Sequence, residues 1–377
     1  MRLSVVRALA EVPESAWQAL SGTAEPFQHY ALLNALEVHD CLEPQGWLPH
    51  HLLAWNGEHL VGAMPLYLRD NSQGEFVFDW NWAEAYARAG GDYYPKLVTA
   101  VPFTPVTGAR LLLAPDAPPE TAESLIEAAI GLAEDNALSS WHCLFPHESQ
   151  LPLLSRPDLI RREGCQYHWF NDGYADFAQF LETLTSKRRK EIRRERREIP
   201  AAGVEIEIHE GSEISDALWQ TFHRFYCDTF DRKWGSPRLT LDFFRTLSRT
   251  PGLHPVLFMA RLDGAYVAGA FALRGPDTLY GRHWGCTRFV RNLHFELCYY
   301  QTIDYAIRHG LSRVDAGAQG EHKIARGFNP VRTWSVHWIR DASFRRAVAD
   351  FCRREERHIE AYVSQVSSAT AYREVDQ

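Results

Sequence analysis

One hairpin pattern occurs twice in this sequence, and the repetition constrains the fold more than any other feature does. W-N-G-E-H-L-V-G-A at 55–63 aligns without a gap with L-D-G-A-Y-V-A-G-A at 262–270. An Asn-Gly or Asp-Gly pair between apolar runs is a strong signal for a tight β-hairpin. Two copies of the same signal therefore indicate two structural units of related design.

A helix and then a strand are predicted after the hairpin in both halves. The first half has a helix at 120–136 and a strand at 140–145. The second half has a strand at 278–286, a helix at 294–309 with apolar residues at helical spacing, and a strand at 312–316. The matching order of elements predicts an internal duplication with one topology in both halves.

The predicted fold class is α/β (α+β), with two tandem domains at 1–165 and 166–377 and a groove between them. A chain of 377 residues is long enough for each domain to bury a core. Prolines at 95, 102 and 105 interrupt a strand-like run in the first half. Because proline cannot donate to a strand ladder, this run is predicted to be an edge strand or a rim that lines a groove.

Composition argues against several classes of protein. The net charge of -8 argues against nucleic-acid binding by the whole surface. The seven cysteines are odd in number and form no C-x-x-C, and no histidine lies at metal-ligand spacing, so we expect no disulfide framework and no metal. No secretory leader and no apolar run of membrane-spanning length is visible, so we expect a cytoplasmic protein without membrane insertion.

A strongly basic segment at 177–198 lies between the two halves and is predicted to be a helix of the second domain. Its cations include Lys187, Arg188, Arg189, Arg193 and Arg194. Such a run is usually a solvated helix stiffened by Glu–Arg pairs one turn apart. The alternative is a clamp for a polyanion, since guanidinium groups match phosphate geometry. Both interpretations stay open.

The stretch 315–330 is the first candidate for a functional site. It places four ionisable side chains within six positions, between glycines at 317, 320 and 327; they are Glu321, His322, Lys323 and Arg326. Glycine lets a backbone bend and approach a ligand closely. A solvated loop with incidental charge is the alternative.

Two further sets of residues are candidates for substrate contact. The strand at 278–286 carries Arg282, His283 and Trp284, and the chain order could bring them near the 315–330 stretch; a core histidine is the alternative. The segment 227–237 includes Lys233 and Trp234, which would form either a substrate-binding rim or a charged helix end.

Residues in the second half resemble the FemABX-type aminoacyl-transferases. The resemblance rests on the basic helix and following strand, L-T-S-K-R-R-K-E-I-R-R-E-R-R-E-I-P-A-A-G-V, and on F-E-L-C-Y-Y-Q-T-I-D-Y-A-I-R-H-G-L-S-R-V-D-A-G with K-I-A-R-G-F-N-P. The chain is most similar to a FemAB-like group of the GNAT (Gcn5-related N-acetyltransferase) superfamily, of peptidoglycan biosynthesis/recognition type. The strong match covers 177–338.

The resemblance implies two GNAT-like domains in tandem and acyl transfer to an amine of a small-molecule or peptidic acceptor. It implies aminoacyl-tRNA or an acyl-CoA as donor, with no tightly bound cofactor. The glycine-rich pyrophosphate loop of single-domain GNAT enzymes is not legible between 286 and 294. This departure favours aminoacyl-tRNA over coenzyme A, and tRNA would then be a partner held by the basic helix.

Acyl transfer to an amine needs a proton acceptor and a cation at the developing oxyanion. Lys323 or Arg326 would supply the positive charge, and His322 or Glu321 would take the proton from the amine. Tyr300 is the predicted proton donor to the leaving group, because Tyr299 belongs to the apolar stripe of its helix. Predicted substrate contacts are Arg326, His283, Trp284, Arg282, Lys233, Trp234 and Glu296.

Two other functions remain open at this stage. One is a non-catalytic GNAT-fold protein that recognises a peptidic or polyanionic ligand. The other is an acetyl-CoA-dependent N-acetyltransferase. Convergence of the 321–326 side chains on one cavity together with Tyr300 would favour an enzyme, whereas their use in ion pairs would favour a binding protein.

Overall fold

The structure is a computed structural model that describes residues 1–377 except 23–24, 232–234, 318–319, 369 and 374–377. Contacts divide the chain into two compact units, Met1–Cys165 with Arg332–Ala361 and Gln166–Val331 with Tyr362–Gln377. We call them unit 1 and unit 2. The domain limits predicted from the sequence, 1–165 and 166–377, and the groove predicted between them stay predictions.

Unit 1 combines two antiparallel-rich sheets with four helices of its own in the described residues. The strand orders are β1-β3-β4-β7 and β2-β5-β6-β8-β15. Its elements are β1 Arg2–Val6, α1 Glu14–Ser21, α2 Tyr30–Val38, β2 Trp47–Pro49, β3 His51–Asn56, β4 His59–Met64, β5 Leu66–Arg69, α3 Trp80–Arg88, β6 Lys96–Thr99, β7 Leu112–Leu113, α4 Thr121–Asp135 and β8 Ser140–Leu144. Three elements contribute residues to both units, namely β9 Ile160–Phe170, β15 Asn329–Ile339 and α11 Ala342–Ser368.

The core of unit 1 forms under α4. Its buried face repeats at helical spacing, with Ala122, Leu125, Ile126 and Ala129 in one row. This stripe packs on β3, β4 and β8, so the amphipathic pattern of the sequence selects the face that leaves water. The helix predicted at 120–136 and the strand predicted at 140–145 are both present at these positions.

The strand predicted as an edge is central, which corrects the expectation drawn from the prolines. β6 pairs with β5 on one side and with β8 on the other. Prolines 95, 102 and 105 all lie outside Lys96–Thr99, so no ladder donor is lost within the strand.

A central β6 carries Lys96 into the interior of unit 1. The Lys96 ammonium is fully buried and donates to Glu75, Asp79 and Ser72 at 2.8, 2.6 and 2.8 Å. Burial alone would raise the pKa of Asp79, but Lys96 and its other neighbours hold the pKa below its usual range. A buried ammonium with two carboxylates is therefore a fixed part of this core.

A pair of buried histidines lies on the same side of β8. Trp141 and Cys143 face the α4 core, whereas Ser140 and His142 alternate to the other face. Nδ1 of His142 lies 2.6 Å from Nδ1 of His337 in β15. Burial lowers the pKa of His142 to about 3 and that of His337 well below its usual value. Both rings are therefore neutral and share one proton between these nitrogens.

The described residues of unit 2 include six strands in the order β10-β11-β12-β13-β14-β9. Its elements are α5 Phe177–Thr183, α6 Ser186–Ala201, β10 Val204–Glu210, α7 Asp216–Asp231, α8 Leu241–Arg249, β11 His254–Leu262, β12 Ala265–Arg274, β13 Thr278–Cys286, α9 Leu293–Phe295, a π-helical turn Glu296–Tyr300, α10 Gln301–Arg308 and β14 Arg313–Asp315. All contacts are antiparallel except the pairing of β13 with β14.

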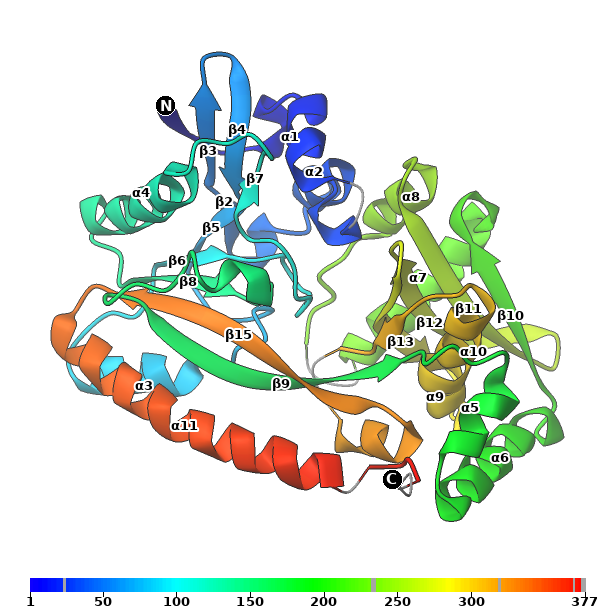
Figure 1. Ribbon diagram of the computed structural model, residues 1–377. Helices are drawn as coiled ribbons and strands as arrows, with labels where there is room; N and C mark the ends of the chain where they lie inside the picture. The colour runs from blue at the N-terminus through cyan, green and yellow to red at the C-terminus, as the bar shows by residue number, and fades with distance from the viewer. Residues whose placement is uncertain (23–24, 232–234, 318–319, 369, 374–377) are drawn as a thin grey trace. The chain divides into compact units, whose positions relative to one another are not determined.

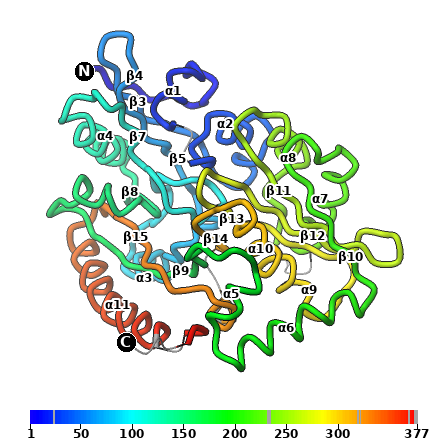
Figure 2. Tube along the Cα trace, turned by 45° about the vertical axis from the view of Figure 1, so that its right-hand side comes forward, coloured from blue at the N-terminus to red at the C-terminus, as the bar shows by residue number. Residues whose placement is uncertain are grey.

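Helices cover both faces of this sheet, as Figures 1 and 2 show for α7 and α8 on one side of β11–β13 and α9 and α10 on the other. Alternation along β12 explains the arrangement. Ala268, Ala270 and Ala272 belong to the core that includes α10, whereas Phe271 packs edge-on against aromatic rings of α7 and α8. Alternation along β12 therefore gives each face of the strand its own helix layer.

The two predicted hairpins have the same irregularity, which supports the duplication. β3 and β4 lose register after Ala54, which leaves Val61 as an extra residue. β11 and β12 lose register after Ala260, which leaves Val267 as the extra residue. Each bulge follows its two-residue turn at the same distance, although both turn and bulge are displaced by one residue between the two halves in the gapless alignment.

The basic segment is two helices rather than one, which corrects the single helix predicted at 177–198. α5 ends at Thr183, where Leu184 is buried and Thr185 donates its N–H to the carbonyl of Ala371. α6 then begins at Ser186 and carries all the basic residues. Among the described helices, none is at once long and apolar enough to cross a membrane.

Candidate functional site

A small cavity in unit 2 opens where two parallel strands stop pairing. β13 and β14 pair only from Thr278–Tyr280 to Arg313–Asp315, and β13 then continues to Cys286 without β14 beside it. The cavity has a volume of about 110 Å³. Its lining includes Gly281, Trp284, His294, Cys298, Tyr299 and Ala316.

A β-bulge and an ion pair hold β13 and β14 together at the point where their pairing ends, which we call the fork. Phe271 pairs with His283 and Ala272 with Gly281, so Arg282 is the extra residue of β13. The bulge turns the Arg282 guanidinium to Asp315, whose carboxylate it binds at 2.9 Å with both side chains almost fully buried. Arg282 therefore ties β13 to the end of β14 at the point where the pairing ends.

Gly285 lets α7 pack directly on the cavity strand. A Cβ at this position would lie 2.0 Å from the carbonyl oxygen of Phe225. Thr229, one turn further along α7, donates its hydroxyl to the carbonyl of Trp284 at 3.0 Å. The glycine thus fixes the helix against the strand, as only a residue without a side chain permits.

Lys323 closes the other side of the fork. Its ammonium is buried and donates to the carbonyl oxygens of Ala316 and Gly317 at 2.7 and 2.8 Å. Gly317 has a φ of +79° and donates its own N–H to Asp315 at 2.9 Å. The turn after β14 is therefore held by the Asp315 carboxylate and the Lys323 ammonium. Because an ammonium has three N–H groups, Lys323 has one donor left after these two hydrogen bonds.

Burial lowers the pKa of Lys323 to about 8, although the nearby Asp315 opposes this shift. The group is mostly charged at neutral pH but loses its proton in mildly alkaline solution. A cation of this kind beside a cavity can stabilise negative charge that develops on a substrate oxygen.

His322 and Tyr299 form a polar pair at the same cavity. The Tyr299 hydroxyl lies 2.8 Å from Nε2 of His322, and Tyr299 itself lines the cavity. Burial, followed by the charges of Arg326 and Lys323, lowers the pKa of His322, so its ring is neutral at neutral pH. A Cβ on Gly320 would lie 2.5 Å from this ring, so the glycine at 320 is what leaves room for it.

The π-helical turn explains why Tyr299 faces the cavity. It widens the helix over Glu296–Tyr300, and such single turns occur often at functional sites. His294 lies edge-on to Trp284 at 5.3 Å and to Tyr299 at 5.5 Å. These aromatic rings form one wall of the cavity.

Arg326 and Tyr300 lie in a separate, fully buried network. The Arg326 guanidinium binds both oxygens of Glu195 at 3.0 Å and donates to the Tyr300 hydroxyl at 2.9 Å. Tyr300 donates in turn to Glu195, and Phe295 covers the guanidinium at 3.5 Å. Neither side chain lines the cavity, so this geometry favours Tyr299 over Tyr300 as the tyrosine that could touch a substrate.

The remaining predicted residues fall into three groups. His283 and Trp284 line the cavity with Arg282, and burial lowers the pKa of His283 to about 3. Glu296 is buried and pairs with Arg196 at 3.2 Å instead. The other predicted positions, namely Lys233, Trp234 and the side chain of Glu321, lie outside the described residues. Lys323 and His322 do not line the cavity themselves, but each bonds a residue that does, Ala316 for Lys323 and Tyr299 for His322. The catalytic and binding roles of all these residues stay predictions.

The outer face of α6 presents cations to solvent. Exposed cations on this helix are Lys187, Lys190, Arg193, Arg194 and Arg197, whereas Ile192, Glu195 and Ile199 are buried. Arg194 lies 3.8 Å from Glu198, and Arg188 lies 2.9 Å from Glu191. Within the described chain, the other exposed cations of this face have no carboxylate within ion-pair distance.

Sequence reasoning missed Glu195 and underrated Tyr299. A signal for Glu195 was present, because Ile192 and Ile199 flank it at i−3 and i+4 and place it on the apolar stripe of α6. Tyr299 was assigned to the core because of its helical position, and a π-helical turn leaves no mark in a residue pattern.

Comparisons with known proteins agree with this architecture. The FemAB-like family, described as peptidoglycan biosynthesis/recognition, matches residues 8–374. FemX is similar with a TM-score of 0.54 and 10% identity over 93% of this chain and 100% of that chain. L-PGS from Bacillus licheniformis is similar with a TM-score of 0.55 and 10% identity, over 90% of this chain and 95% of that chain. No curated protein sequence matches this chain significantly.

A third similar structure is the C-terminal domain of a putative lysylphosphatidylglycerol synthetase from Agrobacterium fabrum. Its TM-score is 0.55 and its identity 10%, over 91% of this chain and 96% of that chain. At such identities the structures establish the fold, which confirms the predicted tandem GNAT-like architecture of mixed helix and sheet. Because the family match spans nearly the whole sequence, this chain belongs to the FemAB-like family.

Proposed function

We propose that the protein is an N-acyltransferase that moves an acyl or aminoacyl group to the amine of a small-molecule or peptidic acceptor. The observation that carries the proposal is the cavity at the β13–β14 fork, where the lining residues Ala316 and Tyr299 are hydrogen-bonded to the buried Lys323 and to the neutral His322. The family assignment and the aminoacyl-transferase type of fold support the same reaction class.

In the proposed reaction the acceptor nitrogen attacks the acyl carbonyl carbon, and the bond from this carbon to the leaving oxygen or sulfur breaks. His322 takes the proton of the amine on Nδ1 while its Nε2–H donates to Tyr299. Tyr299 passes its hydroxyl proton to the leaving group and regains one from Nε2 of His322. The net result moves one proton from the amine to the leaving group, and the 2.8 Å contact between the two side chains supports this transfer.

Lys323 is the proposed oxyanion donor. Two of its N–H groups bind Ala316 and Gly317, which leaves the third for the substrate carbonyl oxygen. Loss of one such donor typically costs about 3 kcal/mol of transition-state stabilisation, or roughly a hundredfold in rate.

The reaction is tested with labelled donors and a panel of amines. Wild-type protein is incubated with total aminoacyl-tRNA or with acyl-CoA, and transfer of label to each amine is measured. We expect His322→Gln and Lys323→Met each to lower the rate at least about a hundredfold. The exposed His254, replaced by Gln, is the matched control and should leave the rate unchanged. Equal rates in wild type and both variants would refute the assigned roles.

The exposed face of α6 supports aminoacyl-tRNA as the donor. Reversal of Lys187, Lys190 and Arg193 to Glu should abolish tRNA binding and leave the melting temperature nearly unchanged, because these side chains are exposed and surface charges contribute little to stability. For the wild type, log K should fall by nearly one unit per phosphate contact for each decade of salt.

A control triple variant reverses three exposed arginines elsewhere, Arg88, Arg354 and Arg357. This variant has the same change in net charge but leaves α6 intact, so it should bind tRNA as the wild type does. If wild type binds no tRNA and is stabilised by coenzyme A instead, the donor is an acyl-CoA. If no donor supports transfer while a polyanion binds, the protein is a binding module. The ion pair of Arg326 with Glu195 is compatible with this alternative, because it removes Arg326 from the set of candidate catalytic groups.

A further inference from the structure

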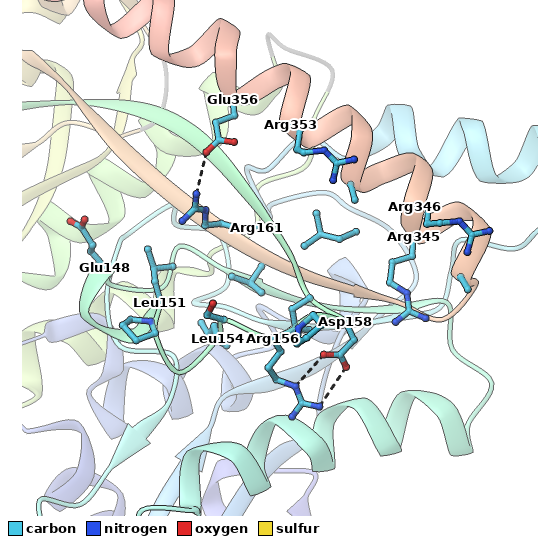
Figure 3. A pocket seen from close by; sticks show the side chains of 18 residues that line it. Glu148, Leu151, Leu154, Arg156, Asp158, Arg161, Arg345, Arg346, Arg353 and Glu356 are labelled. Carbon is cyan, nitrogen blue, oxygen red and sulfur yellow. Dashed lines mark hydrogen bonds and ion pairs between the residues drawn. The ribbon is translucent and has the colours of Figure 1, made fainter.

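Unit 1 contains a large cavity that the proposed reaction does not use. Its volume is about 1030 Å³, and it lies between the segment 148–161 and the first half of α11 (Figure 3). Leu154, Ile160 and Val336 are buried and form an apolar floor. This volume lies near the upper end of the range typical of small-molecule sites.

The rim of the cavity is rich in cations. Five arginines and three carboxylates line it. Most of the arginines have a carboxylate partner. Arg161 binds Glu356 at 3.1 Å and Arg156 binds Asp158 at 3.2 Å. Arg353 pairs with Asp350 on its own helix. These three guanidinium groups are accounted for by protein contacts.

Arg345 and Arg346 differ from the other three. In the part of the chain that the structure describes, neither has a carboxylate within ion-pair distance, although Arg346 donates to the hydroxyl of Ser343 at 3.2 Å. Arg345 is half-buried and lies 5.9 Å from the ring of Trp338. A guanidinium partly removed from water without a counter-charge carries a desolvation cost that an anion would offset.

Within the described residues, the N-terminal end of α11 does not supply a carboxylate partner for Arg345 or Arg346. α11 begins at Ala342, and the Asp341 carboxylate already accepts the N–H of Phe344 at 2.7 Å. In Figure 3, Arg345 reaches from α11 toward the end of the cavity where Arg156 and Asp158 lie. Arg345 therefore lies among the residues that line this end of the cavity.

We propose that this cavity binds a small soluble organic anion, with a carboxylate or phosphate head at Arg345 and Arg346 and an apolar body on the floor of Leu154, Ile160 and Val336. Two features select this class of ligand. Unpaired guanidinium groups match the two oxygens of a carboxylate or phosphate in a forked contact. The apolar floor favours a ligand with hydrocarbon next to the charged head, because each buried methylene adds about fourfold in affinity.

The site is tested by isothermal titration calorimetry on the full chain with three probes, which are hexyl phosphate, inorganic phosphate and hexanol. We expect hexyl phosphate to bind most tightly, inorganic phosphate more weakly, and hexanol not at all. The double variant Arg345→Gln/Arg346→Gln should weaken hexyl phosphate at least tenfold. The matched control Arg354→Gln/Arg357→Gln changes exposed arginines of the same helix outside the cavity and should bind as the wild type does.

A second variant tests the apolar part. Leu151→Asn, at a half-buried lining position, should weaken hexyl phosphate and leave inorganic phosphate unchanged. Melting curves of all variants establish that each one folds. The proposal is overturned if hexyl phosphate binds no tighter than phosphate, if the arginine variant binds equally well, or if anionic phospholipid vesicles bind while the soluble probes do not. None of these outcomes depends on transferase activity in unit 2.

Discussion

Replacement of Lys96 by Met should destabilise unit 1 severely. The substitution keeps the length of the side chain but removes an ammonium that contacts Glu75 and Asp79 at 2.8 and 2.6 Å in a site without solvent. Both carboxylates would then face each other in the core, with Arg69 as the remaining cation near Glu75 at 3.3 Å.

The expected magnitude follows from this geometry. Loss of one partner of a buried ion pair typically costs about 3–5 kcal/mol, because the other charge stays buried without compensation. For a unit of roughly 200 residues this corresponds to a fall in melting temperature of about 10 °C. The cost should shrink in mildly acid solution, because the two abandoned carboxylates have raised pKa values in the folded variant and regain stability as they take up protons.

Differential scanning calorimetry measures the shift, and hydrogen exchange locates it. We expect faster exchange in β5, β6 and β8, with α7 and α8 of unit 2 unchanged. Lys187→Met is the matched control, because Lys187 is exposed and should change the melting temperature by less than about 1 °C. If Lys96→Met melts within about 2 °C of the wild type, the buried ammonium does not have the role assigned to it.

Three further outcomes follow from the pKa values and ion pairs. The transfer rate should fall as pH rises through about 8, where Lys323 loses its proton, and Lys323→Arg should extend the plateau to higher pH in a pH–rate profile. Glu195→Gln should cost about 3 kcal/mol in denaturant unfolding by leaving Arg326 without a counter-charge, and an unchanged midpoint would contradict this. Because folding depresses the pKa of His142 to about 3, stability should be lost as pH falls from about 6.5 toward that value; His142→Asn should flatten this acid limb, measured by thermal melts across pH.

Local sequence signals predicted the elements with the clearest patterns. The strand Thr278–Cys286 occurs with the predicted limits, and both hairpins occur around their Gly-containing turns. The helix α3 at Trp80–Arg88 was not predicted, because its aromatic residues obscure the helical period. Proline density was misleading for β6, since only the positions of the prolines relative to the strand decide whether ladder donors are lost.

The candidate site was predictable only in part. Glycine spacing and clustered charge identified the segment that holds Lys323 and His322, because a tight turn needs residues of this kind. The partners of these side chains come from distant parts of the sequence, as Glu195 does for Arg326 and Asp315 for Arg282. Such pairs depend on tertiary contacts, which residue spacing along the chain does not encode. The cavity in unit 1 escaped notice for the same reason.

The discontinuity of unit 1 has a consequence for biosynthesis. Strand β8 pairs with β15 through Ser335↔Leu144 and its neighbours, and this part of β15 reaches the ribosome exit only after the segment Gln166–Val331 of unit 2 has been translated. Until then one edge of β8 has no neighbouring strand, and Trp141 lacks its cross-strand partner Trp338. Closing so long a loop costs entropy and slows folding, and an unpaired edge invites association with other nascent chains. Unit 1, although it begins at the N-terminus, therefore cannot complete its sheet until most of unit 2 has been translated.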